Sequence, residues 1–292
     1  MPLFAAEGLS LSLPDLNAKR LFRPAPRIEI LHGLDFEIKE RSCVGIVGES
    51  GSGKSTLGRA LVRLHQPTGG RLTFDGKDIT HLGEDALRPL RRHLQVIFQD
   101  PSSSLNPRHT VGAIVEAPLR LHGIDNPPKA AREALDQVGL PGAFASRYPH
   151  ELSGGQRQRV GIARAVALRP RFIFADEIVS GLDTSTQAQV IALLKRLQEE
   201  LSLTIAFVSH DLSVVRHLCD RLMVMSAGRI VEQGDTAAIF DAPQAPETRA
   251  LKAAIPLPEI EPGWLTQTPS SAAPPGAPAA PDTTQDAPAA TG

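Results

Sequence analysis

The loop at 48–56 constrains the fold of this chain more than any other feature of its sequence. It reads GESGSGKST, matches the pattern G-x-x-x-x-G-K-[ST], and lies between a predicted buried strand and a predicted helix. Glycines let backbone amides turn inward around phosphate oxygens, and the helix presents its positive N-terminus to the anion. The loop therefore predicts a nucleotide phosphate site. The residues expected to bind the nucleotide are Gly48, Glu49, Ser50, Gly51, Ser52, Gly53, Lys54, Ser55 and Thr56.

Two side chains of this loop have the chemistry that a nucleoside triphosphate requires. Lys54 is expected to bridge the β- and γ-phosphates of ATP, and the Ser55 hydroxyl is expected to ligate Mg²⁺. A flexible Gly/Ser turn is the alternative interpretation. A Lys-Ser pair between a strand and a helix has no structural need, so the phosphate site is the better interpretation.

Two adjacent carboxylates, Asp176 and Glu177, follow the apolar run FIFA at 172–175. Burying them costs too much free energy unless a cation is near, so this strand end should face the phosphate site. Asp176 is expected to hold Mg²⁺, and Glu177 to accept the proton of the attacking water as general base. A carboxylate pair that opens a helix N-terminus is the alternative.

Gln99 and His210 follow two further apolar runs, LQVIF at 94–98 and TIAFV at 204–208. Gln99 is a candidate to orient water and contact the metal, and His210 is a candidate to bond the γ-phosphate. Either residue alone is more often a solvated or structural group. Their assignment therefore depends on the other motifs of the chain.

The apolar runs alternate with polar or helical segments, a pattern typical of a mainly parallel sheet with helices on both faces. The residues at 28–47 indicate edge strands that lead to a buried one, and 71–79 predicts a hairpin with its turn near Asp75-Gly76. A helix of about a dozen residues should follow the phosphate loop. We expect an α/β fold: a P-loop NTPase (RecA-like) core with an N-terminal antiparallel β-subdomain and an inserted helical subdomain.

The helical patterning at about 101–164, without strand-like runs, predicts a subdomain inserted into the ATPase domain. We expect that domain at 28–240, after an N-terminal segment at 1–27 and before an extension at 241–262. The tail at 263–292 is rich in Pro and Ala and has few large apolar groups, so it should be disordered.

Composition limits the partners and the location of the protein. The 31 Lys and Arg against 32 Asp and Glu give a formal net charge of −1, which gives no reason to expect a nucleic-acid partner. No apolar run reaches the roughly 18 to 20 residues of a membrane span, and the N-terminus lacks the pattern of a signal peptide. We expect a soluble cytoplasmic protein. Cys43 and Cys219 lack the spacing of a zinc site or a disulfide framework, and both read as buried core residues.

The subclass is indicated by the segment LSGGQ, which resembles the signature motif of the ABC ATPase family. The order of motifs is also that of the family: phosphate loop, Gln99, signature, FIFADE at 172–177, SGLD at 180–183, then His210. The resemblance covers about 28–256 of the chain. The signature residues are Leu152, Ser153, Gly154, Gly155 and Gln156.

This resemblance implies that two ATPase domains pair head to tail. Ser153 and Gly155 would approach the γ-phosphate bound to the opposite subunit, so that ATP joins the two domains. Hydrolysis would remove the bridging charge and let the dimer open. Asp183 would lie across the interface and report the state of one site to the other.

A finer resemblance lies in FQDPSSSLNPRHTVG at 98–112 and DAPQAPETRALKAAIP at 241–256, which are similar to segments of the oligopeptide, dipeptide and nickel importer ATPases. It implies a peripheral subunit on the cytoplasmic face of the inner membrane. Two permease subunits would insert short helices beside Gln99 and 101–120. A second ATPase subunit, the same or similar, would complete the motor, and an extracytoplasmic solute-binding protein would deliver the cargo. A soluble ABC ATPase of a non-transport complex is the alternative.

The chain departs from the importer pattern at several positions. Ile178 stands where Pro is usual and Gly181 where Ala is usual, which predicts retained hydrolysis with a more pliable turn at 178–183. Ala-Pro-Glu-Thr at 245–248 replaces the usual His-Pro-Tyr-Thr, and the extra cysteines of some relatives are absent, so we expect no iron–sulfur cluster. Phe22 is a candidate to stack on adenine, with a packing role as the alternative.

Overall fold

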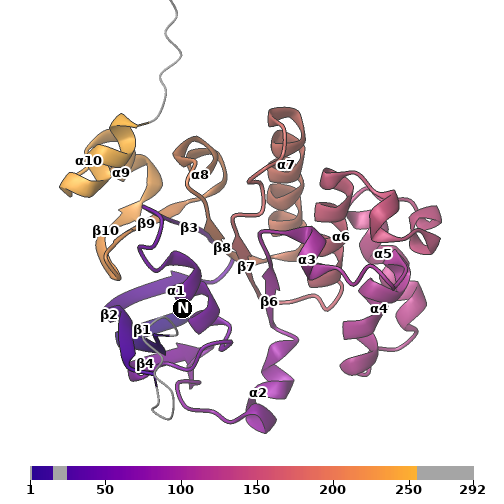
Figure 1. Ribbon diagram of the computed structural model, residues 1–292, viewed down its shortest axis with the longest axis horizontal. Coiled ribbons are helices and arrows are strands. Elements are labelled where there is room, and N and C mark those ends of the chain that lie inside the picture. The colour runs from indigo at the N-terminus through magenta and orange to yellow at the C-terminus, as the bar shows by residue number, and fades with distance from the viewer. Residues whose placement is uncertain (1, 16–24, 255–292) are drawn as a thin grey trace, which may run out of the picture. The chain divides into compact units, whose positions relative to one another are not determined.

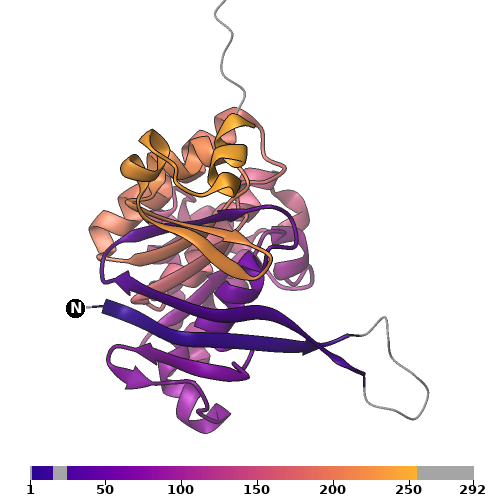
Figure 2. The ribbon, with the colours of Figure 1, turned by 90° about the vertical axis from the view of Figure 1, so that its left-hand side faces the viewer.

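The computed structural model describes residues 2–15 and 25–254. An antiparallel sheet of strand order β2-β1-β4-β5 opens the fold, and Figure 2 shows β1 and β2 as a long hairpin. The strands are β1 (Pro2–Pro14), β2 (Arg27–Lys39), β4 (Gly69–Phe74) and β5 (Lys77–Asp78). The predicted turn at Asp75-Gly76 joins the last two. Phe22 and the tail at 263–292 lie outside the described residues.

Strand β1 was not predicted, because a bulge interrupts its alternation. The register with β2 shifts between Ala6 and Leu9, where Gly8 adopts a left-handed φ of 58°. The inward positions therefore change from even to odd numbers along the strand, and a period of two is lost. The strand nevertheless buries Phe4, Leu9 and Leu11.

The second sheet has the order β10-β9-β3-β8-β7-β6. Its strands from β9 to β6 pair in parallel, and only β10 is antiparallel to its neighbour, so the prediction of a mainly parallel sheet is confirmed. The strands are β3 (Cys43–Gly48), β6 (Leu94–Ile97), β7 (Phe172–Asp176), β8 (Thr204–Val208), β9 (Arg221–Ser226) and β10 (Arg229–Asp235).

Helices surround this sheet, and Figure 1 shows those from α3 to α6 gathered beyond β6. Helix α1 is eight residues long, shorter than expected, because the chain turns away after it through a left-handed residue, Arg63. Among the described helices, none has the length and apolar character needed to cross a bilayer. The helices are α1 (Lys54–Leu61), α2 (Glu84–Arg91), α3 (Pro101–Ser104), α4 (Val111–Leu121), α5 (Pro127–Gln137), α6 (Gly154–Val166), α7 (Thr184–Leu201), α8 (Leu212–Leu218), α9 (Thr236–Asp241) and α10 (Pro246–Ala253).

The packing of α1 on β7 places the phosphate loop beside the acidic end of that strand. A Cβ added to Gly58 would lie 1.9 Å from the ring of Phe174, so the helix backbone rests directly on the aromatic side chain. On the same side of the sheet, the ring of Phe172 meets that of Phe4 with centroids 4.7 Å apart. The two sheets thus share one aromatic core around α1.

The two cysteines are buried, as predicted, but their contact was not predicted. Cys43 begins β3 and Cys219 follows α8, and their Sγ atoms lie 3.4 Å apart as free thiols. The hydrogen bond to Cys219 and burial raise the pKa of the Cys43 thiol well above its usual value. A buried pair of free thiols behaves as core packing.

Candidate nucleotide-binding and hydrolysis site

The phosphate loop joins β3 to α1 in a conformation that requires its glycines. Gly53 precedes the helix with φ 99°, in the left-handed region. A Cβ on Gly48 would lie 2.1 Å from the carbonyl oxygen of Met225, so no side chain fits there. The amide of Gly228 donates to the carbonyl of Ser52 at 3.1 Å and fixes the middle of the loop. These contacts fix the start of α1, and with it the unpaired backbone amides of the first helical turn, which can bind an anion.

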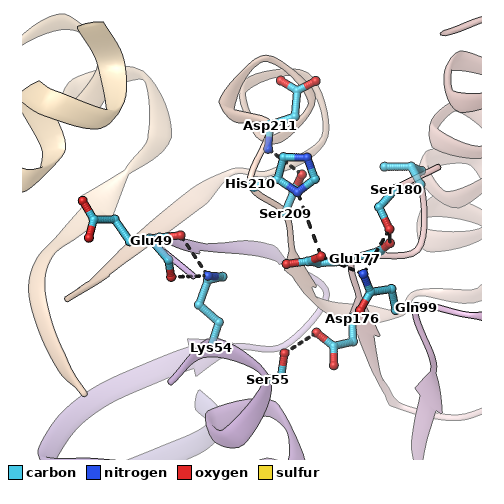
Figure 3. Close-up of polar contacts among 12 residues, drawn as sticks. Glu49, Lys54, Ser55, Gln99, Asp176, Glu177, Ser180, Ser209, His210 and Asp211 are labelled. Carbon is cyan, nitrogen blue, oxygen red and sulfur yellow. Dashed lines mark hydrogen bonds and ion pairs between the residues drawn. The ribbon is translucent and has the colours of Figure 1, made fainter. Parts of the chain in front are cut away.

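Lys54 lies buried against its own loop. Its Nζ donates to the carbonyls of Gly48 at 2.8 Å and Glu49 at 2.7 Å, as Figure 3 shows. Burial lowers the pKa of this ammonium, while the nearby carboxylates of Glu177 and Asp176 oppose that shift. The loop thus contains a cation whose charge is incompletely balanced, which favours an anionic ligand.

One hydroxyl of the loop has no partner. Ser52 Oγ is buried and makes no hydrogen bond within the described part of the chain. A buried donor without a partner costs free energy, and a phosphate oxygen in the loop would remove that cost. This observation fits a bound nucleotide.

Ser55 and Asp176 form an oxygen pair below the loop. The Ser55 hydroxyl donates to Oδ1 of Asp176 at 2.7 Å. Burial raises the pKa of Asp176, and the Ser55 hydrogen bond and the charges of Arg59 and Lys54 oppose the shift. A hydroxyl and a carboxylate are hard ligands of the kind that Mg²⁺ prefers, and a divalent cation would offset the cost of burying the anion. The donor set therefore fits Mg²⁺.

Glu177 leaves the strand through a left-handed turn. Its φ is 48°, its amide donates to the carbonyl of Val208 at 3.1 Å, and its carbonyl accepts from Ser180 Oγ at 2.7 Å. In a regular strand Asp176 and Glu177 would face opposite sides of the sheet. The turn instead brings both carboxylates toward the same site, as Figure 3 shows. A non-glycine residue held at positive φ is the kind of local strain found at functional sites.

The side chain of Glu177 meets the other two predicted residues. Gln99 Nε2 donates to Glu177 Oε2 at 3.0 Å, and His210 Nδ1 lies 4.0 Å from the same oxygen. A cavity of about 80 Å³ adjoins Glu177 and His210, with Ser180 and Ser209 also in its wall. Polar walls of this kind suit ordered water. The structure thus brings the predicted residues from β3, β6, β7 and β8 together at the carboxyl end of the parallel strands.

The signature segment does not lie at this site. Ser153 caps α6 through a capping box: its Oγ accepts from Gln156 N at 3.3 Å, and its own amide donates to Gln156 Oε1 at 3.0 Å. Leu152 is buried before it. In Figure 1, α6 and α1 lie on opposite sides of β6 and β7, so the signature is separated from the phosphate loop of its own chain.

Asp183 caps the neighbouring helix α7. Its carboxylate accepts from the amide of Thr186 at 2.9 Å and from the Thr186 hydroxyl at 2.7 Å. These hydrogen bonds lower the pKa of Asp183. The carboxylate remains exposed, so it is ionised and open to a further partner at neutral pH.

Three residues that support the site were not identified from the sequence. Ser180 binds the Glu177 carbonyl, and Gln187 Nε2 donates to the carbonyls of Val179 and Leu182, both at 3.1 Å. Ser209 Oγ accepts the amide of Asp211 at 3.0 Å. Each bonds to backbone groups, and Ser180 Oγ also accepts from Gln99 Nε2 at 3.4 Å. The spacing of Gln187 one helical turn after Asp183 was the only available signal.

Comparison with known proteins supports the same assignment over most of the chain. The sequence profile described as ABC transporter matches residues 31–180. A putative peptide import ATP-binding protein of Brucella ovis is 48% identical over 261 residues, covering 88% of this chain and 80% of its own length. The putative oligopeptide transport ATP-binding protein YkfD of Bacillus subtilis is 50% identical over 265 residues, covering 89% and 78%.

A solved structure shares the fold. The ATP-binding cassette MJ0796, in a dimeric post-hydrolysis state bound to ADP and Pi, matches with a TM-score of 0.69 and 32% identity. The match covers 80% of this chain and 98% of that one. Together with the assembled phosphate loop and the two carboxylates, these likenesses show that the chain belongs to the ABC transporter family, as one of its ATP-hydrolysing cassettes.

Proposed function

We propose that this chain is the ATP-binding and ATP-hydrolysing subunit of an importer that energises the uptake of peptides or a related small solute through partner permeases. The observation that carries the proposal is that five side chains lie together at one site: Lys54, Ser55, Asp176, Glu177 and Gln99. The relatives' printed roles in peptide import and oligopeptide transport support the cargo class.

The proposed reaction uses the side chains in separate roles. The loop amides and Lys54 bind the phosphates, and Glu177 accepts the proton of the attacking water as general base. Gln99 holds Glu177 Oε2 and so orients the base. His210 bonds the γ-phosphate. When Mg²⁺ is bound, it neutralises phosphate charge; Ser55, Asp176 and Gln99 would hold it.

We place the complete site between two subunits. Because α6 lies away from its own phosphate loop, Ser153 and Gly155 would act on the nucleotide of a second copy or of a similar ATPase. The helix N-terminus behind Ser153 offers amides to the γ-phosphate. Loss of that phosphate would remove the charge that joins the subunits, and the dimer would open.

A groove between the core and α4 is the proposed docking site for the permeases. It has a volume of about 480 Å³, and its wall holds three apolar side chains that are unusually exposed: Leu64 at 48%, Phe98 at 37% and Leu121 at 78%. Arg164 adds positive charge, and the described residues of the wall include no acid. Arg91 also lines the wall, but its charge is paired with Glu84 at 2.7 Å. A short cytoplasmic helix with apolar and acidic residues would fit this groove.

This arrangement would make the protein a peripheral subunit on the cytoplasmic face of the inner membrane. Two permease subunits would occupy the grooves of the two ATPase subunits, and an extracytoplasmic solute-binding protein would deliver the cargo without touching this chain.

Isolation of the native complex tests the proposal. The tagged protein is purified from detergent-solubilised membranes of its host, and the proteins that accompany it are identified by mass spectrometry. Two permeases are the expected result, and a second ATPase would show a heteromeric motor. Recovery of soluble proteins alone would contradict the importer and favour a non-transport complex.

A pair of variants tests the groove in the same experiment. Leu121→Glu should lose the permeases and keep ATP binding, because Leu121 is remote from the phosphate loop. Ile28→Glu is the matched control, since Ile28 is an aliphatic residue of β2 that is also exposed, at 47%, but lies outside the groove. Equal loss of the permeases from both variants would contradict the docking assignment.

A further inference from the structure

Thr186 contacts both Asp183, at the start of its own helix α7, and Gly155, at the start of α6. The proposed function directs the start of α6 at the partner subunit, and the family resemblance implies the same for Asp183. The Thr186 amide and hydroxyl both donate to the carboxylate of Asp183, at 2.9 and 2.7 Å. Each carboxylate oxygen receives one of these bonds, Oδ1 from the amide and Oδ2 from the hydroxyl. A carboxylate held at both oxygens by one residue has little freedom to rotate.

The methyl group of the same side chain rests on the signature. A Cβ added to Gly155 would lie 2.5 Å from Thr186 Cγ2, so α6 can approach α7 this closely only where the signature has a glycine. Leu182 packs more loosely beside Gly154, at 3.7 Å from the corresponding position. The tight contact between the two helix starts is therefore made by the Thr186 methyl.

We propose that Thr186 is a positioning residue that sets Asp183 and Gly155 as one unit for the nucleotide of the opposite subunit. This inference rests on the proposed function, because it requires a site completed in trans. The branched β-carbon is what allows one side chain to hold both elements. The amide bond to Asp183 remains in any variant. Serine would keep the hydroxyl bond and lose the methyl contact, and valine would keep the methyl contact and lose the hydroxyl bond.

A second link between the helices does not replace this one. Arg159 NH2 donates to Gln189 Oε1 at 3.0 Å, about one turn further along both helices. That exposed bond holds the helices together but touches neither Asp183 nor Gly155. A displacement of Asp183 would therefore move Gly155 through Thr186, and the reverse.

The test uses ATP-dependent dimerisation of the full chain with Glu177→Gln, which should keep ATP bound. Thr186→Val and Thr186→Ser are added separately, with Thr184→Val as matched control, since Thr184 lies exposed on the same helical turn. Dimer formation is followed by light scattering against ATP concentration. Nucleotide affinity is measured at protein concentrations too low for dimers, and kcat and KM are measured for the same substitutions with Glu177 intact.

We expect Thr186→Val to raise the ATP concentration for half dimerisation about tenfold, as loss of a charge-assisted hydrogen bond does, and Thr186→Ser about threefold. Thr184→Val should change nothing. Monomer affinity and thermal unfolding should stay as in the parent, while kcat falls in the order of wild type, serine and valine.

Two groups of results would overturn the inference and separate it from the proposed function. Three results would show that Thr186 is an ordinary structural residue. The valine variant could dimerise like its parent, Thr184→Val could be equally impaired, or monomer affinity could fall in parallel. A Glu177→Gln parent that binds ATP and never dimerises would overturn the composite site itself, and the inference with it.

Discussion

The phosphate-loop region and the signature region of this chain differ in how far each is completed by its own residues. Lys54 and Asp176 are buried and bonded to other parts of the same site, so the ATP-binding half is assembled in one subunit. Ser153 and Asp183 are exposed, and within the described ranges their side chains bond only to the helices that they cap. The phosphate-loop region therefore lacks only its ligand. The signature region, which ends in exposed helix caps, requires the surface of another subunit.

The largest effect that this comparison predicts is at Glu177. Glu177→Gln should lower the ATPase rate by at least about a hundredfold, because the amide cannot accept the proton of water. ATP binding should persist, since the bonds of Lys54 and Ser55 are untouched, and Gln99 can still donate to the new side-chain oxygen. Phosphate release and nucleotide retention are the measurements. Turnover near the wild-type rate would exclude Glu177 as general base.

Ser153→Arg tests the exposed region directly. We expect hydrolysis to be abolished, because the long cation would occupy the space into which the opposite nucleotide must fit. Affinity for ATP should remain unchanged in the monomer, since α6 lies away from its own loop. Fluorescent-nucleotide titration and an ATPase assay check both expectations. If monomer affinity collapses together with the rate, the two regions do not belong to different sites.

A smaller effect is expected at the bond that ties the antiparallel sheet to β7. Arg171 donates to Asp75 Oδ2 at 2.6 Å and to Glu40 Oε1 at 2.8 Å. Arg171→Ala should lower the free energy of unfolding by about 1 kcal/mol or less, because solvent screens both partly exposed carboxylates. Arg221→Ala, which loses the longer bond to Asp235 at 3.4 Å, serves as the control and should cost less.

The pH dependence of the Arg171 effect follows from Asp75. The Arg171 hydrogen bond lowers the pKa of Asp75 below its usual 3.8. The bond therefore contributes stability above pH 3.8, and this contribution is lost as pH falls through the lowered pKa. Urea unfolding at pH 7 and at successively lower pH should show the difference between the variant and wild type shrink below pH 3.8. A constant difference would contradict the assignment.

The smallest effect is expected from removing the tail. Deletion of 264–292 should leave the ATPase rate and the unfolding temperature unchanged, because this Pro- and Ala-rich segment has few large apolar groups with which to pack. A large drop in either quantity would show that the tail packs on the ATPase domain, and the comparison would have to include it.

The residues that the sequence singles out for the assembled half lie close together, because their motifs stand at strand ends where period-two patterns stop. Their roles stay predictions. The sequence did not predict β1, whose bulge at Gly8 breaks the alternation. It also missed Thr186 and Gln187, because their roles depend on backbone groups or a neighbouring helix that no local pattern reveals. The contact between Cys43 and Cys219 was missed for the same reason: only the topology brings them together.

The departures at Ile178 and Gly181 do not disturb the described geometry. Gly181 has φ 75°, and open space surrounds the position of a Cβ, so glycine is chosen there for its backbone rather than for room. Gln187 fastens the turn from the helix side. The pliability predicted for 178–183 stays a prediction, which hydrogen exchange of these amides would measure.

The contact between Gly58 and Phe174 has a consequence for Ser55 and Asp176, the two side chains proposed to hold Mg²⁺. Because the backbone of α1 rests on that ring, the thickness of one aromatic side chain sets how far Ser55 stands from Asp176. The distance between these two side chains is therefore set by a hydrophobic residue of the core. Phe174 acts as a spacer, and a different ring or a missing one would change the distance between Ser55 and Asp176.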